Sequence, residues 1–132
     1  MKDPNCIFCK IVSKEIHAEI IYEDDDLLAF IDINPVHLGH TLLIPKEHYM
    51  WMQETPDNII GKIFLKAKQI MLAMKKGFLS DYIKLGVVGN EVPHFHVHLI
   101  PHKLLEDKKE GRKTYTNAKQ MAEYAEKIRK EL

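Results

Sequence analysis

The 132-residue sequence lacks the features that would mark a membrane, secreted or nucleic-acid-binding protein. No apolar run approaches the ~20 residues that a helix needs to cross a bilayer. Residues 1–5 carry charge but no apolar stretch behind it, so they do not resemble a signal peptide. Lysine plus arginine and aspartate plus glutamate number 19 each, which leaves no excess positive charge for nucleic acid or an anionic membrane. We therefore expect a soluble, cytoplasmic protein that binds neither.

Cysteine is scarce as well, and the two present, Cys6 and Cys9, form a Cys-x-x-Cys pair. In a reducing compartment such a pair more often binds a metal or does redox chemistry than forms a structural disulfide. Two thiolates supply half of a tetrahedral zinc site, and imidazoles suit the other half. Spacing alone does not select which of the eight histidines would complete the set.

Apolar periodicity and turn residues predict up to five strands and two main helices. A long helix is predicted over 55–77, because threonine and proline open it and apolar residues recur at helical spacing. A helical turn over 7–13, a final helix over 117–129 and a solvated loop over 103–113 are also expected. The predicted strands cover residues 20–23, 27–31, 40–44, 82–88 and 93–100.

The arrangement of these elements predicts the fold class. Short links between most of the strands favour antiparallel neighbours. Hydrophobic residues make up 45% of the sequence, enough for one globular domain with its own core. The sequence therefore predicts an α+β fold in which a meander sheet is accompanied by one long helix and one C-terminal helix.

Three histidines alternate with apolar residues in the run His94-Phe95-His96-Val97-His98-Leu99-Ile100. Alternate side chains of a β-strand point to opposite faces, so a strand here places the three imidazoles on one face. Neighbouring imidazoles would lie ~7 Å apart along that face, close enough to share one small ligand. A fold does not need three histidines on one strand face, and the pattern therefore indicates a functional site.

The chemistry of imidazole favours a reaction at phosphorus. Imidazole is a nucleophile and, once protonated, a leaving group near neutral pH. A histidine on this strand can attack phosphorus while a neighbouring imidazole supplies protons or binds phosphate oxygens. No paired serine or cysteine nucleophile is apparent, which argues against acyl transfer. A His-x-His pair can also hold a metal, and the pattern leaves that alternative open.

The histidine run resembles the signature of the histidine triad (HIT) family, His-x-His-x-His followed by two apolar residues. Residues 6–12, 21–24, 29–35 and 39–46 resemble further HIT blocks in the same order, and only the loop and helix over 103–132 lack a recognisable counterpart. The resemblance implies one HIT domain over residues 1–132, with a five-stranded antiparallel meander sheet, one long central helix and a C-terminal helix. It also implies a homodimer with a purine nucleotide site in each subunit.

The resemblance implies roles for individual residues. In HIT enzymes the middle histidine, here His96, attacks the α-phosphate and forms a nucleotidyl-histidine intermediate. His98 contacts phosphate and leaving group, and His40 borders the site. The implied nucleotide-binding residues are Ile16, Phe30, Asp32, Ile33, Asn90, Glu91 and His98. A carboxylate at Asp32 can accept hydrogen bonds from ribose hydroxyls, whereas Phe30 is equally compatible with core packing.

The Cys-x-x-Cys pair is similar to that of the zinc-bearing, Hint-like bacterial and archaeal branch of the family. The implied zinc ligands are Cys6, Cys9, His48 and His94. His94 would then tie an N-terminal arm of residues 1–13 to the histidine strand, while the other two histidines of the triad remain for chemistry. Such a closed zinc site contributes folding energy rather than acting as a Lewis acid.

The segment before the triad departs from many HIT proteins. Residues 86–92 are shorter than the usual glycine-rich loop and carry Asn90 where glutamine is common. Asn90 can still donate an amide hydrogen bond to phosphate, with a shorter reach. Glu91 stands near the expected leaving group, at a position that often holds a hydroxyl residue, and His102 stands where arginine is frequent. These differences leave the chemistry intact and the substrate open.

Three functions are consistent with this resemblance. The preferred one is a hydrolase that cleaves a purine nucleotide conjugate, such as a nucleoside phosphoramidate, and releases a nucleoside monophosphate such as AMP. A dinucleoside polyphosphate hydrolase would use the same nucleophile with a different leaving group. A non-catalytic nucleotide-binding regulatory module is the third, and the intact triad counts against it.

Overall fold

The computed structural model describes residues 2–104 and 112–132. The expected α+β class, with a five-stranded antiparallel sheet, a long helix and a C-terminal helix, is confirmed. Part of the loop expected over 103–113 lies outside the described residues. In chain order the elements are α1 (Ile7–Val12), β1 (Ile20–Glu23), β2 (Leu27–Ile31), β3 (Thr41–Pro45), the 3-10 turn η1 (Met52–Glu54), α2 (Asp57–Phe78), β4 (Tyr82–Val87), β5 (Val97–His102) and α3 (Ala118–Arg129).

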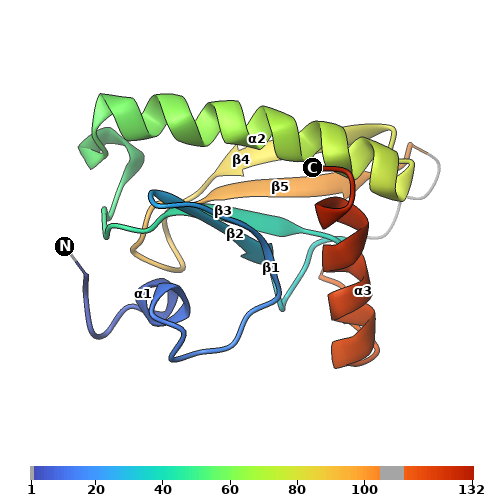
Figure 1. Cartoon of the computed structure of the whole chain (residues 1–132), viewed down its shortest axis with the longest axis horizontal. Coiled ribbons are helices and arrows are strands. Elements are labelled where there is room, and N and C mark those ends of the chain that lie inside the picture. Colours follow the sequence, from blue (N-terminus) through green and yellow to red (C-terminus); the bar gives the residue numbers. More distant parts are fainter. Residues whose placement is uncertain (1, 105–111) are drawn as a thin grey trace.

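The strand order in the sheet is β1-β2-β3-β5-β4, which differs from a simple meander at one place. The first three strands are sequential neighbours, but β5 pairs with β3 and leaves β4 at the edge. After β3 the chain passes through the long helix α2 and returns as β4 at the edge of the sheet (Figure 1). The next strand, β5, then lies between β3 and β4. Consequently His98 lies between two strands, opposite Leu42 on β3 and Gly86 on β4.

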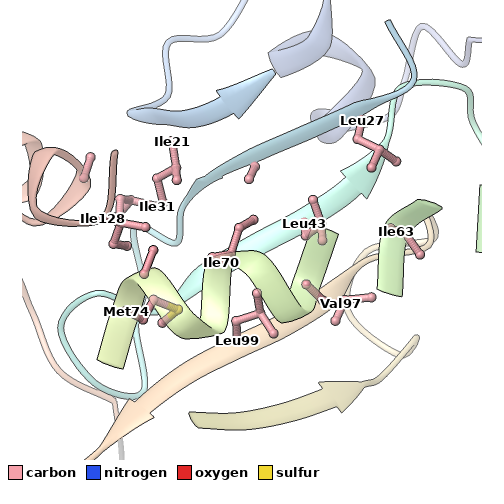
Figure 2. Packing of buried hydrophobic residues seen from close by; sticks show 14 of the residues in the cluster. Ile21, Leu27, Ile31, Leu43, Ile63, Ile70, Met74, Val97, Leu99 and Ile128 are labelled. Carbon is pink, nitrogen blue, oxygen red and sulfur yellow. The ribbon is translucent and has the colours of Figure 1, made fainter. Parts of the chain in front are cut away.

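Each face of the sheet is covered by a different part of the chain. Figure 1 shows α2 along one face and α1 below the other. The main core lies under α2, where its apolar side meets the sheet and α3, and Figure 2 labels Ile21, Leu27, Ile31, Leu43, Ile63, Ile70, Met74, Val97, Leu99 and Ile128. A second cluster on the opposite face joins α1 to β2 and β3. Among the described residues, no helix combines the length and apolar character needed to cross a membrane.

The alternation of the histidine run is confirmed, although β5 begins later than expected. The strand starts at Val97, so His94 and His96 precede it. Nevertheless Phe95, Val97 and Leu99 all belong to the core under α2. Alternate side chains of extended backbone face opposite ways, and the three imidazoles therefore lie on the face away from α2.

The turn before β3 is held from two sides. Gly39 has a φ of +96°, a conformation that residues with a Cβ rarely adopt. A Cβ at this position would lie 2.6 Å from the ring of Phe78 at the end of α2. The Gly39 N–H donates to the hydroxyl oxygen of Tyr115 at 3.0 Å, which ties the turn to the C-terminal segment. The next residue, His40, is thereby fixed immediately before β3.

We predict that Gly39→Ala lowers the free energy of unfolding by about 1–3 kcal/mol, because it combines backbone strain with a steric clash. Gly61→Ala is the matched control: Gly61 lies within α2 and a Cβ there meets nothing within 4 Å. Alanine at that helical position is expected to stabilise the protein by up to about 1 kcal/mol. Urea unfolding of the parent protein, Gly39→Ala and Gly61→Ala checks both the expected decrease and the expected increase in the free energy of unfolding. Equal stability of Gly39→Ala and the parent protein would contradict the assignment.

Candidate functional site

A cavity of about 170 Å³ opens on the sheet face away from α2. Ligand pockets usually measure about 300–1,000 Å³, so this cavity fits the reacting end of a ligand rather than all of a large one. Five residues expected from the sequence line it, namely His40, His96, His98, Asn90 and Glu91. The other lining residues are Val36, Lys84, Gly86, Val88, Ile100 and Arg112.

Hydrogen bonding assigns the tautomers of His40 and His98. The Val36 N–H donates to Nδ1 of His40 at 3.1 Å, so this nitrogen carries a lone pair. The proton of a neutral His40 is therefore on Nε2, which lies 2.9 Å from Nδ1 of His98 and donates to it. As a result, the proton of His98 is on its own Nε2. A neutral His98 thus offers an N–H donor at Nε2.

His96 has the opposite tautomer. Its Nδ1 lies 2.7 Å from the carbonyl oxygen of His94, which can only accept, so Nδ1 carries the proton. The lone pair of a neutral His96 is then on Nε2. The rings of His96 and His98 are 4.8 Å apart between centroids. The site therefore combines one imidazole with a nucleophilic nitrogen and one with a donor nitrogen.

Burial keeps two of these imidazoles uncharged. It lowers the pKa of His40 to about 3, with a smaller contribution from the neighbouring His98. Burial also lowers the pKa of His98 to about 4, with smaller contributions from the nearby His96 and then Arg112. Oδ2 of Asp32 lies 3.6 Å from Nε2 of His40, but burial outweighs that attraction. At pH 7 the N–H of His98 is therefore a neutral donor.

The residues expected to hold base and ribose lie outside the cavity lining. Asp32 is near it, with a side chain 14% exposed and a pKa that burial raises. Ile33 is 72% exposed. Phe30 is only 3% exposed and its ring meets that of Phe8 at 5.5 Å, so it is part of the second core. Ile16 packs against the same cluster and is half-buried.

The four expected metal ligands meet at the start of the histidine run. Their ligand atoms, from Cys6, Cys9, His48 and His94, all lie within 4.8 Å of one another. Nδ1 of His94 is 3.4 Å from the sulfur of Cys6 and 3.6 Å from that of Cys9, whose sulfur is 3.3 Å from Nδ1 of His48. Tetrahedral zinc with bonds of about 2.3 Å to sulfur and 2.0 Å to nitrogen requires sulfur–nitrogen separations of about 3.5 Å. The spacing fits zinc.

Neighbouring groups prepare these atoms for a cation. Nε2 of His94 lies 2.9 Å from the carbonyl oxygen of Pro45 and donates to it, which leaves the lone pair on Nδ1 facing the sulfurs. Backbone N–H groups of Asp3 and Cys9 approach the two sulfurs at 3.4 Å. Burial raises the pKa of the Cys6 thiol, so this sulfur needs a cation to become a thiolate at neutral pH. The donor set is compatible with a structural zinc site.

A second group of potential ligands, Asp32, His40 and His98, is less suited to a metal. Metal binding needs a lone pair on each ring nitrogen that faces the ion. Nε2 of His40 carries a proton because Nδ1 accepts from Val36. The hydrogen-bond network therefore favours a chain of neutral hydrogen bonds over a metal centre at these residues.

Comparison with known proteins identifies the family. The family model of the HIT domain matches residues 13–104, which is well over half of the chain. The chain belongs to the HIT family. The whole sheet and every lining residue of the histidine cavity except Arg112 fall within the matched region, whereas residues 112–132, which include α3, fall outside it.

Curated relatives include proteins with and without a named activity. An uncharacterized HIT-like protein of Methanocaldococcus jannaschii is 43% identical over 73% of this chain and 78% of its own length. The adenosine 5'-monophosphoramidase HNT1 of Saccharomyces cerevisiae is 37% identical over 83% of this chain and 68% of its own. The adenylylsulfatase HINT3 of Arabidopsis thaliana is 38% identical over 75% of this chain and 53% of its own. The named activities among these relatives thus support a hydrolase.

Solved HIT structures have the same fold. A Hit-like protein from Bartonella henselae superposes with a TM-score of 0.89 at 33% identity and covers 98% of both chains. A zinc-bound histidine triad family protein from Mycobacterium smegmatis gives a TM-score of 0.85 at 29% identity, over 96% of this chain and 92% of its own. The zinc in that structure supports a metal role for the cysteine–histidine cluster.

Sequence reasoning missed two cationic residues of the cavity. Lys84 lies on β4, and nothing in its local pattern distinguishes it from a surface lysine. Arg112 belongs to a charge-alternating stretch that was expected to be solvated, yet it lines the cavity. Conversely, His102 lies near the far end of β5 and stacks on Tyr82 with ring centroids 4.8 Å apart. It does not line the cavity.

We predict that the protein, purified without added metal, contains about one zinc per chain, as expected for a closed four-ligand site. Cys6→Ser and His48→Ala should each lower the zinc content well below that value and reduce thermal stability, because each removes one ligand. His17→Ala is the control, since the His17 side chain is 81% exposed and lies outside the cluster. Elemental analysis checks the outcome, and full zinc occupancy in both ligand variants would refute the ligand set.

We also predict that acid weakens the fold through the buried imidazoles. The folded-state pKa values of His40 and His98 lie below the unfolded value of about 6.5, so the unfolded chain binds more protons under pH 6.5. Each group then removes up to about 1.4 kcal/mol per pH unit as the pH falls from 6.5 towards 4. His40→Asn should show a smaller loss of stability than the parent over this range in denaturant titrations. Identical pH dependence of the two proteins would be the contrary result.

Proposed function

We propose that this protein is a nucleotide hydrolase that cleaves at the α-phosphate of a purine nucleotide conjugate, such as a nucleoside phosphoramidate. The reaction would pass through a nucleotidyl-histidine intermediate and release a nucleoside monophosphate such as AMP. The single observation that carries this proposal is the pair of opposite tautomers in one cavity, with a lone pair on Nε2 of His96 and a proton on Nε2 of His98. A nucleophile and a donor are the two groups that displacement at phosphorus requires.

The proposed first step forms one bond and breaks another. Nε2 of His96 attacks phosphorus, and the bond from phosphorus to the leaving group breaks. The departing atom, an amine nitrogen in the case of a phosphoramidate, takes up a proton from solvent, while Nε2–H of His98 donates a hydrogen bond to a phosphoryl oxygen. His40 would hold His98 in the required tautomer, because it donates to Nδ1 of His98. The products of this step are a nucleotidyl-His96 and a protonated leaving group.

The proposed second step restores the site. A water molecule attacks the phosphorus of the intermediate, the phosphorus–nitrogen bond to His96 breaks, and the proton that the water loses returns to solvent. The sum of both steps consumes one water and yields a nucleoside monophosphate and the leaving group. Nε2 of His98 keeps its proton throughout, so the same hydrogen-bond donor faces the phosphoryl group in both steps.

The remaining expected contacts surround this cavity. Asn90 and Glu91 line it and would face phosphate and leaving group. Asp32 would accept hydrogen bonds from ribose hydroxyls, and Ile16 and Ile33 would lie on the side of the base. Phe30 would support that surface from within the core rather than touch the base, since it is 3% exposed.

We further propose a structural role for zinc at Cys6, Cys9, His48 and His94. Bound zinc would supply folding energy by joining α1 to the segment before β5. The carbonyl oxygen of His94 accepts a hydrogen bond from Nδ1–H of His96 and so orients the His96 ring. The cluster would thereby position the nucleophile without contacting the substrate.

The assembly and location that we propose follow from the same family and composition. We propose a homodimer, because the edge strand β4 leaves apolar side chains partly exposed, with Tyr82 at 42% and Val87 at 41%. Two free, buried cysteines with no disulfide suit a reducing, cytoplasmic compartment.

A dinucleoside polyphosphate hydrolase is the second candidate. It would use the same nucleophile but release an anionic leaving group. The observation that favours it is the presence of two cationic side chains, Lys84 and Arg112, in the cavity lining. Their charges would stabilise additional phosphates.

We predict that the protein releases AMP from adenosine 5'-monophosphoramidate and that His96→Ala lowers kcat/KM at least about 1,000-fold, as removal of a covalent nucleophile does in other enzymes. Rapid alkaline quenching and mass measurement should detect a nucleotidyl adduct on the parent protein only. A melting curve separates loss of chemistry from loss of fold, because His96 is buried. Undiminished turnover by His96→Ala would refute the assignment of the nucleophile.

The same assay, run with diadenosine tetraphosphate, separates the competing functions. A higher kcat/KM for the phosphoramidate supports the preferred function, and a higher value for the tetraphosphate supports the second candidate. Nucleotide binding without turnover of either compound would instead support the regulatory module.

A further inference from the structure

Arg112 reaches the histidine cavity from outside the part of the chain that matches the HIT family model. That match ends at residue 104, and Arg112 begins the C-terminal segment of residues 112–117, which leads to α3. Its Nη1 donates to the carbonyl oxygen of Asn34 at 2.6 Å. The N–H of the next residue, Lys113, donates to the carbonyl oxygen of Pro35 at 2.7 Å. Both the side chain and the backbone are therefore attached to the loop that leads to His40.

Two carboxylates flank the guanidinium of Arg112 at distances that favour attraction without good hydrogen bonds. Nη2 lies 3.6 Å from Oε1 of Glu91, and Nη1 lies 3.9 Å from Oδ2 of Asp32. N–H···O hydrogen bonds have lengths of about 2.7–3.2 Å, so both contacts are mainly Coulombic. A guanidinium carries five N–H donors, and among the described residues its hydrogen-bond partner is Asn34. Donors therefore remain for the oxygens of a ligand.

The charges around the cavity explain why such a cation is needed. Burial keeps His40 and His98 neutral at pH 7, as their lowered pKa values indicate. A phosphoryl group that enters the cavity is anionic and meets the negative charge of Glu91 there. The fixed positive charges in the lining are Lys84 and Arg112. Arg112 is the better placed for phosphate, because its planar fork can donate two parallel hydrogen bonds to phosphate oxygens.

We propose that Arg112 is a phosphate-binding residue of this site and donates N–H hydrogen bonds to the α-phosphoryl oxygens of the bound nucleotide. This assignment rests on the proposed function, because it takes the histidine cavity as the place of the phosphoryl group. Upon binding, the guanidinium exchanges its long contacts with Asp32 and Glu91 for charge-assisted hydrogen bonds. The C-terminal segment is then part of the nucleotide site rather than an appendage of the HIT domain.

The test compares the binding of AMP with that of adenosine, which lacks the phosphate. We expect the parent protein to bind AMP more tightly than adenosine in calorimetric titrations. Arg112→Gln should weaken AMP binding about 10–100-fold, the size of charged hydrogen bonds, while adenosine binding changes less than about twofold. Lys113→Gln is the matched control, because it removes the same charge from the adjacent residue, which lines a different cavity. It should leave both affinities unchanged.

Other outcomes overturn the assignment. Parent-like AMP binding by Arg112→Gln removes Arg112 from the phosphate site, and an equal loss of AMP and adenosine binding indicates a purely structural role. A loss of AMP binding in Lys113→Gln equal to that in Arg112→Gln shows a general charge effect instead. Hydrolysis measured in parallel separates this inference from the proposed function. If the parent binds AMP through Arg112 but hydrolyses no conjugate, the hydrolase proposal is wrong and the role of Arg112 in phosphate binding is retained. If the parent hydrolyses the conjugate and Arg112→Gln binds AMP normally, only the role of Arg112 is wrong.

Discussion

The hydrogen bond from the Val36 N–H to Nδ1 of His40 spans 3.1 Å, and the protonation pattern of the histidine cavity follows from it. A backbone N–H can only donate, so it fixes where the proton of His40 resides. That proton then determines the tautomer of His98. The carbonyl oxygen of His94, which can only accept, imposes the opposite tautomer on His96. Two main-chain groups thus give chemically different nitrogens to two neighbouring imidazoles.

The sheet holds these main-chain groups in place because it is covered on both sides. The face under α2 buries the larger core, and the opposite face buries the cluster shared with α1. A helix as short as α1, with six residues, is not stable by its own hydrogen bonds. It is held instead by the contact of Phe8 with the ring of His96, at 5.1 Å between centroids, and by the contacts of its cysteines with His94, so it supports the His96 ring from behind the cavity.

Much of the fold was predictable because it depends on local patterns. The alternation of Phe95, Val97 and Leu99 with histidines gave the correct buried face, and the apolar spacing gave the long helix. The insertion of β5 beside β3 was not predictable in this way, since strand pairing depends on where α2 returns the chain. The prediction that the three histidines share one face was therefore correct, whereas the position of β5 between β3 and β4 could not be predicted from local patterns.

The same distinction applies to the site. His96 was expected from the alternation of the histidines, Asn90 and Glu91 were expected from the family resemblance, and all three line one cavity. Cys6 and Cys9 were expected to bind metal from their spacing, whereas His48, His94 and His40 were assigned by resemblance, because no spacing rule selects them. Arg112 carries no sequence signal at all: its place depends on its own hydrogen bond to Asn34 and on that of the Lys113 N–H to Pro35, more than 70 residues away in the chain.

His94 joins two regions through different parts of one residue. Its ring faces the cysteine sulfurs, and its carbonyl oxygen, a few bonds away, holds the ring of His96. Any rotation of the His94 backbone that accompanied loss of the ring contacts would turn the acceptor away from Nδ1 of His96. The N-terminal arm and the histidine cavity thus share one residue, whose ring belongs to the first and whose peptide carbonyl belongs to the second.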